Sequence, residues 1–147
     1  MGLQWSNLIA ILLAIGLGGA IGFERQMSGK AAGLRTNTLI CLGAAMFTLI
    51  SKQLAGPSDP GTHIAAQIVT GVGFLGAGAI IRDRGGVHGL TTAATIWLVS
   101  SVGMACGAHF YGLAVTVAVI AIIILFALRP MEKLMEGRGG KHKDIAR

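Results

Sequence analysis

The sequence predicts an all-α, polytopic membrane protein: a bundle of five transmembrane helices over residues 1–128, followed by a basic tail over residues 129–147. Three observations support this fold class. Of the 147 residues, 53% are hydrophobic and only 12% are charged, against about 25% charged in a typical globular domain. Mean hydropathy is +0.71. The 23 glycines lie inside apolar runs, where they allow helix backbones in a bilayer to approach one another closely.

A helix that crosses a bilayer needs about 20 mainly apolar residues. Five segments meet this requirement: residues 3–23, 36–51, 64–81, 90–107 and 110–128. The first has no basic segment before its apolar run, so we expect a retained span and not a cleaved signal peptide. The second is short, but Arg35 and Lys52 at its ends can extend their charged groups to the interfaces.

The fourth and fifth spans are predicted as a hairpin. No Lys, Arg, Asp or Glu occurs between Arg84 and Arg129, and at about 1.5 Å per residue this interval is too long for one helix. We place its turn in residues 106–112. Before the fourth span, residues 82–88 form a short charged loop with the sequence RDRGGVH.

The basic residues predict the orientation. With five spans, eleven of the twelve Lys and Arg residues fall on one side of the membrane, and only Lys52 falls on the other. By the positive-inside rule the N-terminus is outside and the tail is cytoplasmic. The net charge of +6 therefore does not call for a nucleic-acid partner. The tail is expected to contact the headgroups of anionic membrane lipids.

A helical projection of the third span separates two faces. Bulky residues, which suit lipid, gather on one: Ile64, Ile68, Val72, Leu75 and Ala79. The small-residue face opposite suits a close-packed neighbour, and it consists of Ala66, Thr70, Gly73 and Ala77, with Gln67, Gly71 and Gly78 beside them. We therefore expect the third span at the centre of the bundle. The fifth span is aliphatic on every side and is expected at the periphery.

Small residues also recur at GxxxG spacing in two other spans. Gly18 and Gly22 lie in the first span, and Gly103 and Gly107 lie in the fourth. This spacing favours close packing of membrane helices. Gly71–Gly76 reads GVGFLG, but it lacks the strand and the acidic residue of a dinucleotide site, so its glycines are also assigned to packing.

Polar residues within the spans are candidates for function. Asn37 and Gln67 carry amides that need several hydrogen bonds, and two alternatives stay open: hydrogen bonds between helices, or the lining of an ion or substrate path. The hydroxyls within the spans, those of Thr91, Thr92 and Thr95 among them, are expected to bond back to the carbonyl one turn earlier.

The membrane edge carries a second group of candidates. For Glu24, Arg25 and Arg35 the alternatives are interfacial anchoring with a local ion pair, or a structured mouth that holds a cation or a partner segment. Glu24 and Asp83 are the only carboxylates near this edge, and two isolated carboxylates make a poor site for a divalent cation.

Nothing in the sequence indicates an enzyme, a cofactor or a metal site. No P-loop, kinase, zincin or serine-hydrolase motif is present. The four histidines are scattered. Cys41 and Cys106 lack the spacing of a redox or metal pair, so we expect both to be small packing residues in apolar surroundings.

Four blocks resemble the signature of the MgtC/SapB family of bacterial membrane proteins. They are GLGGAIGFERQ (16–26), AGLRTNTLICLGAAMF (32–47), DPGTHIAAQIVTGVGFLGAGAII (59–81) and GLTTAATIWLVSSVGMACG (89–107). Their order and spacing match, and they cover most of residues 16–107. By position, the characteristic polar residues of the family fall on Glu24, Arg25, Arg35, Thr36, Asp59, Gln67, Arg82, Thr91 and Thr92.

The resemblance implies a protein of the bacterial inner membrane with about five spans. Some members are virulence factors needed inside macrophages and in low magnesium, and the best-studied member is described as restraining the proton-translocating ATP synthase.

The chain departs from the family pattern in two places. His63 replaces an Arg common in the family, which puts an ion pair of that Arg with Asp59 in doubt. Residues 129–147 are too few to bury a core, so the chain resembles a short form without the ACT-like cytoplasmic domain of many members.

Two functional hypotheses follow. The first is a non-enzymatic regulatory or interaction protein, linked to magnesium limitation, acid stress or virulence. It would be a homo-oligomer that packs its small-residue face against another membrane protein. The alternative is a small oligomeric transporter or channel for a cation or a proton. Asn37, Gln67, Thr91 and Thr92 would then line its path, with Glu24 and Asp83 at the cytoplasmic mouth.

Overall fold

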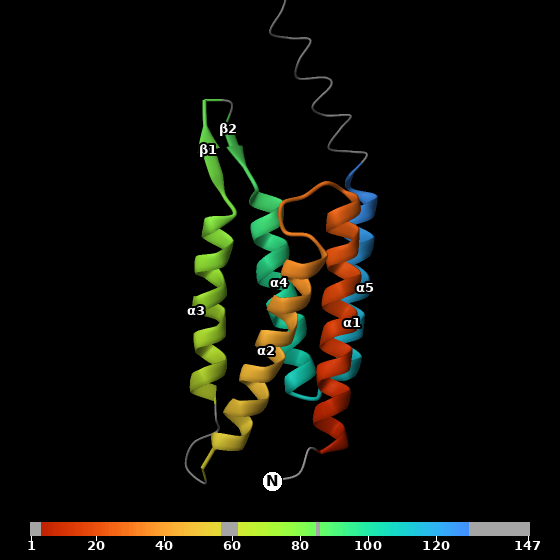
Figure 1. Ribbon diagram of the computed structural model, residues 1–147, viewed down its shortest axis with the longest axis vertical. Helices are drawn as coiled ribbons and strands as arrows, with labels where there is room; N and C mark the ends of the chain where they lie inside the picture. The colour runs from red at the N-terminus through yellow and green to blue at the C-terminus, as the bar shows by residue number, and fades with distance from the viewer. Residues whose placement is uncertain (1–3, 57–61, 85, 130–147) are drawn as a thin grey trace, which may run out of the picture.

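The computed structural model describes residues 4–56, 62–84 and 86–129. These residues form five helices and one two-stranded hairpin (Figure 1). In chain order the elements are α1 (Trp5–Met27), α2 (Leu34–Leu54), α3 (Thr62–Gly78), β1 (Ile81–Asp83), β2 (Gly86–His88), α4 (Leu90–Gly107) and α5 (Tyr111–Ala127).

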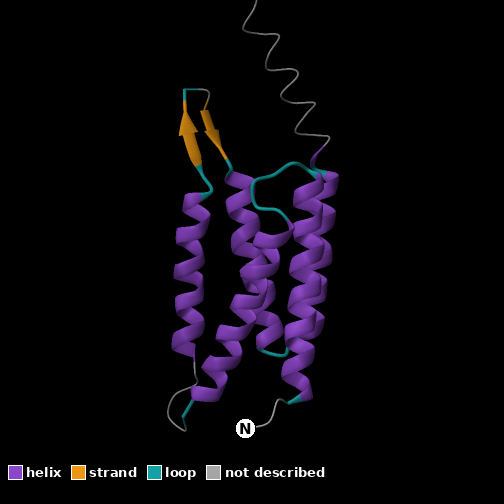
Figure 2. Cartoon of the chain, in the orientation of Figure 1, coloured by secondary structure: helices purple, strands orange, loops and turns teal. Residues whose placement is uncertain are grey.

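The helices lie side by side along the long axis and alternate in direction (Figures 1 and 2). The α1–α2 loop, the hairpin and the end of α5 lie at one end of the bundle, and the start of α1, the end of α2 and the α4–α5 turn lie at the other. By length and apolar character, α1, α2 and α4 can cross a membrane, while α3 and α5 are shorter apolar helices. The predicted turn within residues 106–112 is confirmed.

The centre of the bundle belongs to α4, and not to the third span as the sequence predicts. α4 packs against α1, α2, α3 and α5, whereas α3 packs mainly against α2 and α4 at one side of the molecule. α5 lies at the opposite side, against α1 and α4, which confirms its predicted peripheral place. A helical projection separates the two faces of α3 but does not show which of them meets the rest of the chain.

Both predicted GxxxG pairs lie at close helix contacts. A Cβ atom on Gly18 would lie 2.5 Å from the Cβ of Cys41, and one on Gly22 would lie 2.8 Å from the Cα of Leu34. On α4, Cβ atoms at Gly103 and Gly107 would meet the carbonyl oxygens of Cys41 and Ala45. The glycines therefore bring α1 and α4 against the backbone of α2, as expected of small residues in membrane helices.

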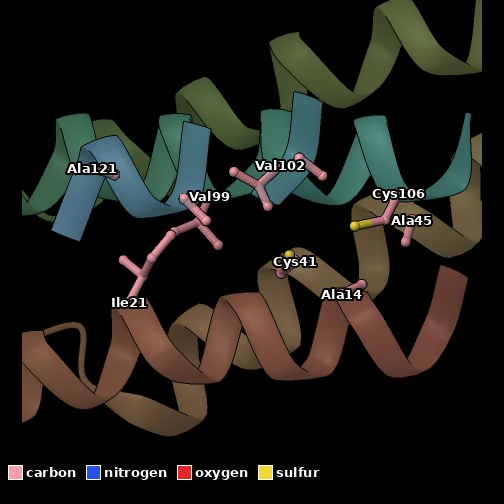
Figure 3. Close-up of a cluster of buried hydrophobic side chains, with 10 residues drawn as sticks. Ala14, Ile21, Cys41, Ala45, Val99, Val102, Cys106 and Ala121 are labelled. Atoms are coloured by element: carbon pink, nitrogen blue, oxygen red, sulfur yellow. The ribbon is translucent and has the colours of Figure 1, made fainter. Parts of the chain in front are cut away.

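The main core lies between α1, α2, α4 and α5 (Figure 3). Ile21, Val99 and Val102 fill it together with alanines from α1, α2 and α5. Cys41 and Cys106 are fully buried free thiols within this cluster, which confirms their predicted role as packing residues.

The predicted all-α fold is wrong at residues 81–88, where the structure has an antiparallel hairpin. Arg82 pairs with Val87, and both strands are exposed. α3 ends at Gly78, three residues before the predicted end of its span, and bonds from Ala79 and Ile80 to carbonyls three residues earlier close its last turn. Gly89 then takes a left-handed φ of 87°, where a Cβ would collide with the carbonyl oxygen of Ala79.

Candidate functional site

The bulky face of α3 packs inward, against the expectation that it faces lipid. Ile68 and Val72 are buried and form a second core cluster with Ala44 of α2 and Ile96 of α4. The cause is the position of α3 at the side of the bundle, where Ile68 and Val72 fill the space next to α2 and α4. Leu75 of the same predicted face is 50% exposed.

The small-residue face of α3 is consequently not covered by the rest of the described chain. All seven of its residues are exposed: Ala66, Gln67, Thr70, Gly71, Gly73, Ala77 and Gly78. A Cβ atom on Gly71, Gly73 or Gly78 would have nothing within 4 Å. Gly76 differs, because it is buried and a Cβ there would lie 3.6 Å from the carbonyl oxygen of Ala93.

A groove of about 510 Å³ runs between α2 and α3 next to this face. Its walls are apolar side chains such as Leu39, Phe47 and Ile64, and Gln67 is the one polar side chain among its lining residues. A groove with a single amide supplies few of the oxygen ligands that Mg²⁺ needs for octahedral coordination.

Asn37 is fully buried near the start of α2. Its Nδ2 donates to the carbonyl oxygens of Ala32 and Gly33, at 2.7 and 2.9 Å. The amide thus holds the α1–α2 loop against α2. Gln67 lies on a different helix and lines the groove, so the two amides do not share a surface.

Glu24 and Arg25 lie in the last turns of α1, and both are largely buried. Arg25 Nη1 is 3.6 Å from Glu24 Oε2, and the two side chains are 3% and 11% exposed, which is the local ion pair expected from the sequence. Ser28 Oγ donates to Glu24 Oε1 at 2.7 Å. Among the described residues, Nε and Nη2 of Arg25 have no hydrogen-bond partner.

The remaining candidates at this end of the bundle are mainly exposed. Arg35 and Thr36, in the first turn of α2, line a shallow depression together with Lys30 of the loop. On the hairpin, Arg82 is exposed and His88 Nε2 lies 3.5 Å from Asp83 Oδ1.

The last candidates lie in α4 or before α3. Thr91 is exposed and Thr92 is buried, both in the first turn of α4. The expected bond from a hydroxyl to the preceding turn is present at Thr95, whose Oγ1 donates to the Thr91 carbonyl oxygen at 2.7 Å. Asp59 lies outside the described residues.

The structure distributes the candidate path residues over separate places. Gln67 lines the α2–α3 groove, whereas Thr91 lines a different, small cavity at the end of α5. Glu24 is at the end of α1 and Asp83 is on the hairpin. In the described ranges, no three His, Cys, Asp or Glu side chains come together as a possible metal site.

A polar cluster at the opposite end of the bundle has no counterpart in the sequence prediction. Lys52 Nζ lies 3.3 Å from His109 Nδ1 and 3.4 Å from the Ala108 carbonyl oxygen. Tyr111 stacks at a tilt on His109 and donates to the Ser6 carbonyl oxygen at 2.8 Å. Burial, and secondly the nearby Lys52 cation, lower the pKa of His109. The α4–α5 turn creates this contact across 57 residues, so no local pattern signals it.

The comparison with protein families decides the assignment. The model of the MgtC family matches residues 11–134. This chain belongs to the MgtC family. The similarity extends over nearly all the helices described above, which confirms the resemblance seen in the four sequence blocks.

Named relatives agree with the family assignment. Protein MgtC of Brucella abortus is 49% identical over 120 residues, which are 82% of this chain and 50% of the relative. Protein MgtC of Salmonella typhimurium is 45% identical, covering 84% of this chain and 53% of the relative. The putative magnesium transporter YhiD of Escherichia coli is 44% identical, covering 80% and 58%. The chain therefore spans about half the length of these relatives. No solved structure matches it.

Proposed function

We propose that this chain is a non-enzymatic regulatory protein of the bacterial inner membrane that acts by lateral helix packing. All five helices span the bilayer in this proposal, with the N-terminus outside and the C-terminus in the cytoplasm. Support comes from the apolar helices, their alternating directions, and the location of the α1–α2 loop, hairpin and α5 end, with their basic residues, at one end.

The observation that carries the proposal is the uncovered small-residue face of α3. In a bilayer, helix association depends on packing and not on hydrophobic exclusion, so glycine-rich surfaces favour helix–helix contact. Elsewhere in the described chain, glycine pairs of this kind lie against another helix, as at Gly18 and Gly103. Gly71, Gly73 and Gly78 lack this spacing, but they are also small and have no such neighbour in the described part of the chain. A helix from another membrane protein, or from a second copy of this chain, fits this face.

The physiological link in this proposal is magnesium limitation, acid stress or virulence. It rests on family membership, on the similarity to the putative magnesium transporter YhiD of Escherichia coli, and on the family properties given above. The proton-translocating ATP synthase is the candidate partner that the family resemblance supplies.

The test is co-purification from native membranes in mild detergent with a Gly73→Leu variant. Gly16 on α1 provides the matched control, because it is exposed and a Cβ there also meets nothing within 4 Å. We expect Gly73→Leu to lose the co-purified partner while membrane insertion is unchanged, and Gly16→Leu to keep it. Equal recovery with both variants would reject the proposal.

Transport of a cation or a proton is the second candidate, favoured by the groove between α2 and α3 with its single amide at Gln67. Its test is flux into liposomes that contain the purified protein. Flux that is present with the unaltered protein and lost in Gln67→Leu supports transport. If the unaltered protein shows no flux, transport is rejected.

A further inference from the structure

A small cavity with a cationic lining lies at the end of the bundle that holds the α1–α2 loop. Arg25 comes from the last turn of α1, Lys30 from the loop and Arg129 from the chain just beyond α5. The cavity has a volume of about 70 Å³, several times the roughly 10–15 Å³ that one water molecule requires. It has room for a small group of atoms.

Arg25 brings a buried charge to the lining of this cavity. Its side chain is 3% exposed, and its Nε and Nη2 atoms have no hydrogen-bond partner among the described residues. A guanidinium does not lose its proton in a protein, and a buried charge needs an opposite charge and satisfied hydrogen bonds. Two donor groups of Arg25 therefore call for an anion.

Glu24 meets this need only in part. Its Oε2 is 3.6 Å from Arg25 Nη1, whereas a charge-assisted N–H···O bond is about 2.7–2.9 Å long. Its other oxygen accepts from Ser28. Among the described residues around the cavity, Glu24 is the one carboxylate set against Arg25, Lys30 and Arg129, so positive charge is in excess there.

The other lining groups indicate the class of anion. Thr91 brings a hydroxyl group, which can donate to an oxyanion, and the planar fork of an arginine matches phosphate oxygens. Ile124 and Leu128 form an apolar wall and are each 49% exposed, so the cavity lies next to an outward-facing apolar surface of the α5 region. Basic pockets of this kind between membrane helices suit phospholipid headgroups.

We infer that the cavity between Arg25, Lys30, Thr91 and Arg129 binds a phosphate oxyanion, with a phospholipid headgroup as its main source. The phosphate occupies the cavity that Arg25, Lys30 and Arg129 line, and the acyl chains run along Ile124 and Leu128. Free phosphate has the same oxygens but lacks those chains, so it would gain nothing from the apolar wall.

The experiment measures binding of two lipids to the whole chain in detergent micelles by native mass spectrometry. Phosphatidylglycerol and a diacylglycerol with the same acyl chains differ only in the phosphate headgroup. We expect about tenfold tighter binding of phosphatidylglycerol, the size expected from one or two charge-assisted hydrogen bonds, and loss of this preference in Arg25→Gln. Arg82→Gln is the control, because it removes the same charge from the exposed hairpin and should keep the preference.

A second arm identifies the source of the phosphate. In the absence of lipid, melting is compared in sodium phosphate and in sodium chloride at equal ionic strength. Saturable stabilisation by phosphate that Arg25→Gln abolishes would support the site and assign it to free phosphate. If Arg25→Gln does not fold, Arg129→Gln takes its place, with the same loss expected. The inference would be overturned if the cavity variants bound phosphatidylglycerol and phosphate as well as the control Arg82→Gln does.

Discussion

Gly103 sets how closely α4 can approach α2, because a Cβ there would meet the carbonyl oxygen of Cys41 and lie 2.9 Å from the Ala44 Cβ. A backbone carbonyl in a helix cannot move aside without shifting that helix. We predict that Gly103→Ala lowers the free energy of unfolding by about 1–3 kcal/mol, the usual cost of overpacking, measured by reversible unfolding in detergent.

Gly43 provides the control for this prediction. It lies in α2, as a helical glycine with nothing within 4 Å of an added Cβ. Gly43→Ala should leave stability unchanged or raise it by less than about 1 kcal/mol, because alanine favours the helix. Equal losses at positions 43 and 103 would show that the close contact is not the cause.

His109 makes stability depend on pH. Its pKa is lowered from the usual value of 6.5 by burial and by Lys52, so the unfolded chain binds a proton at a higher pH than the folded chain. The neutral imidazole makes its full contribution to the free energy of unfolding above pH 6.5. This contribution is lost as the pH falls from 6.5 to the lowered pKa of the folded state, and below that pKa it does not change further. We predict a lower melting temperature at about pH 5 than at about pH 7.5.

The variant His109→Asn should reduce this pH dependence. Asn suits the position because His109 has a left-handed φ of 67°, which Asn tolerates better than most residues. A pH profile of melting that is identical in the variant and the unaltered protein would assign the effect to other groups.

The roles of single residues were only partly predictable from the sequence. The packing glycines were predictable, since GxxxG spacing indicates close contact. The burial of Arg25 was not, because an arginine at the end of a span is usually an interfacial anchor, and this one becomes buried only through tertiary packing. Lys52 and His109 meet through tertiary structure alone.

The packing of α3 against the bundle depends on one narrow face. Val72 is buried in the cluster with Ala44 and Ile96, whereas Val69 on the same helix is 44% exposed. We predict that Val72→Ala lowers the free energy of unfolding by about 1 kcal/mol through lost packing, measured by unfolding in detergent. Val69→Ala removes the same atoms from an exposed site and should have little effect. A larger loss of stability in Val69→Ala than in Val72→Ala would mean that α3 packs on the bundle through its other face.

At the level of elements, apolar length predicted the number and order of the helices well. The prediction ended the third span too late because Ile80 and Ile81 are apolar like the residues of the helix before them, although they belong to the turn and to β1. The hairpin was missed because each strand has only three residues, too few for an alternating pattern. The helical projection separated the two faces of α3 correctly, but the prediction of which face packs against the bundle was wrong.

At the scale of the whole molecule, the lysines and arginines of the described residues lie at one end of the bundle, apart from Lys52. In the proposed orientation the hairpin is cytoplasmic and the end of α2 is periplasmic. We predict that Ala55→Cys reacts with a membrane-impermeant maleimide in intact spheroplasts, whereas Val87→Cys reacts only after lysis. Cys41 and Cys106 are fully buried and should give little background. Labelling of Val87→Cys without lysis would contradict this orientation.

The central claim is that the small-residue face of α3 packs against another membrane protein. The most direct measurement is photo-cross-linking in native membranes from a photoreactive residue at position 77 on this face, with position 16 on α1 as the control. Both sites are exposed. We expect a discrete protein adduct from position 77, identified by mass spectrometry as a partner or a second copy, and none from position 16. Lipid adducts alone from both positions would contradict it.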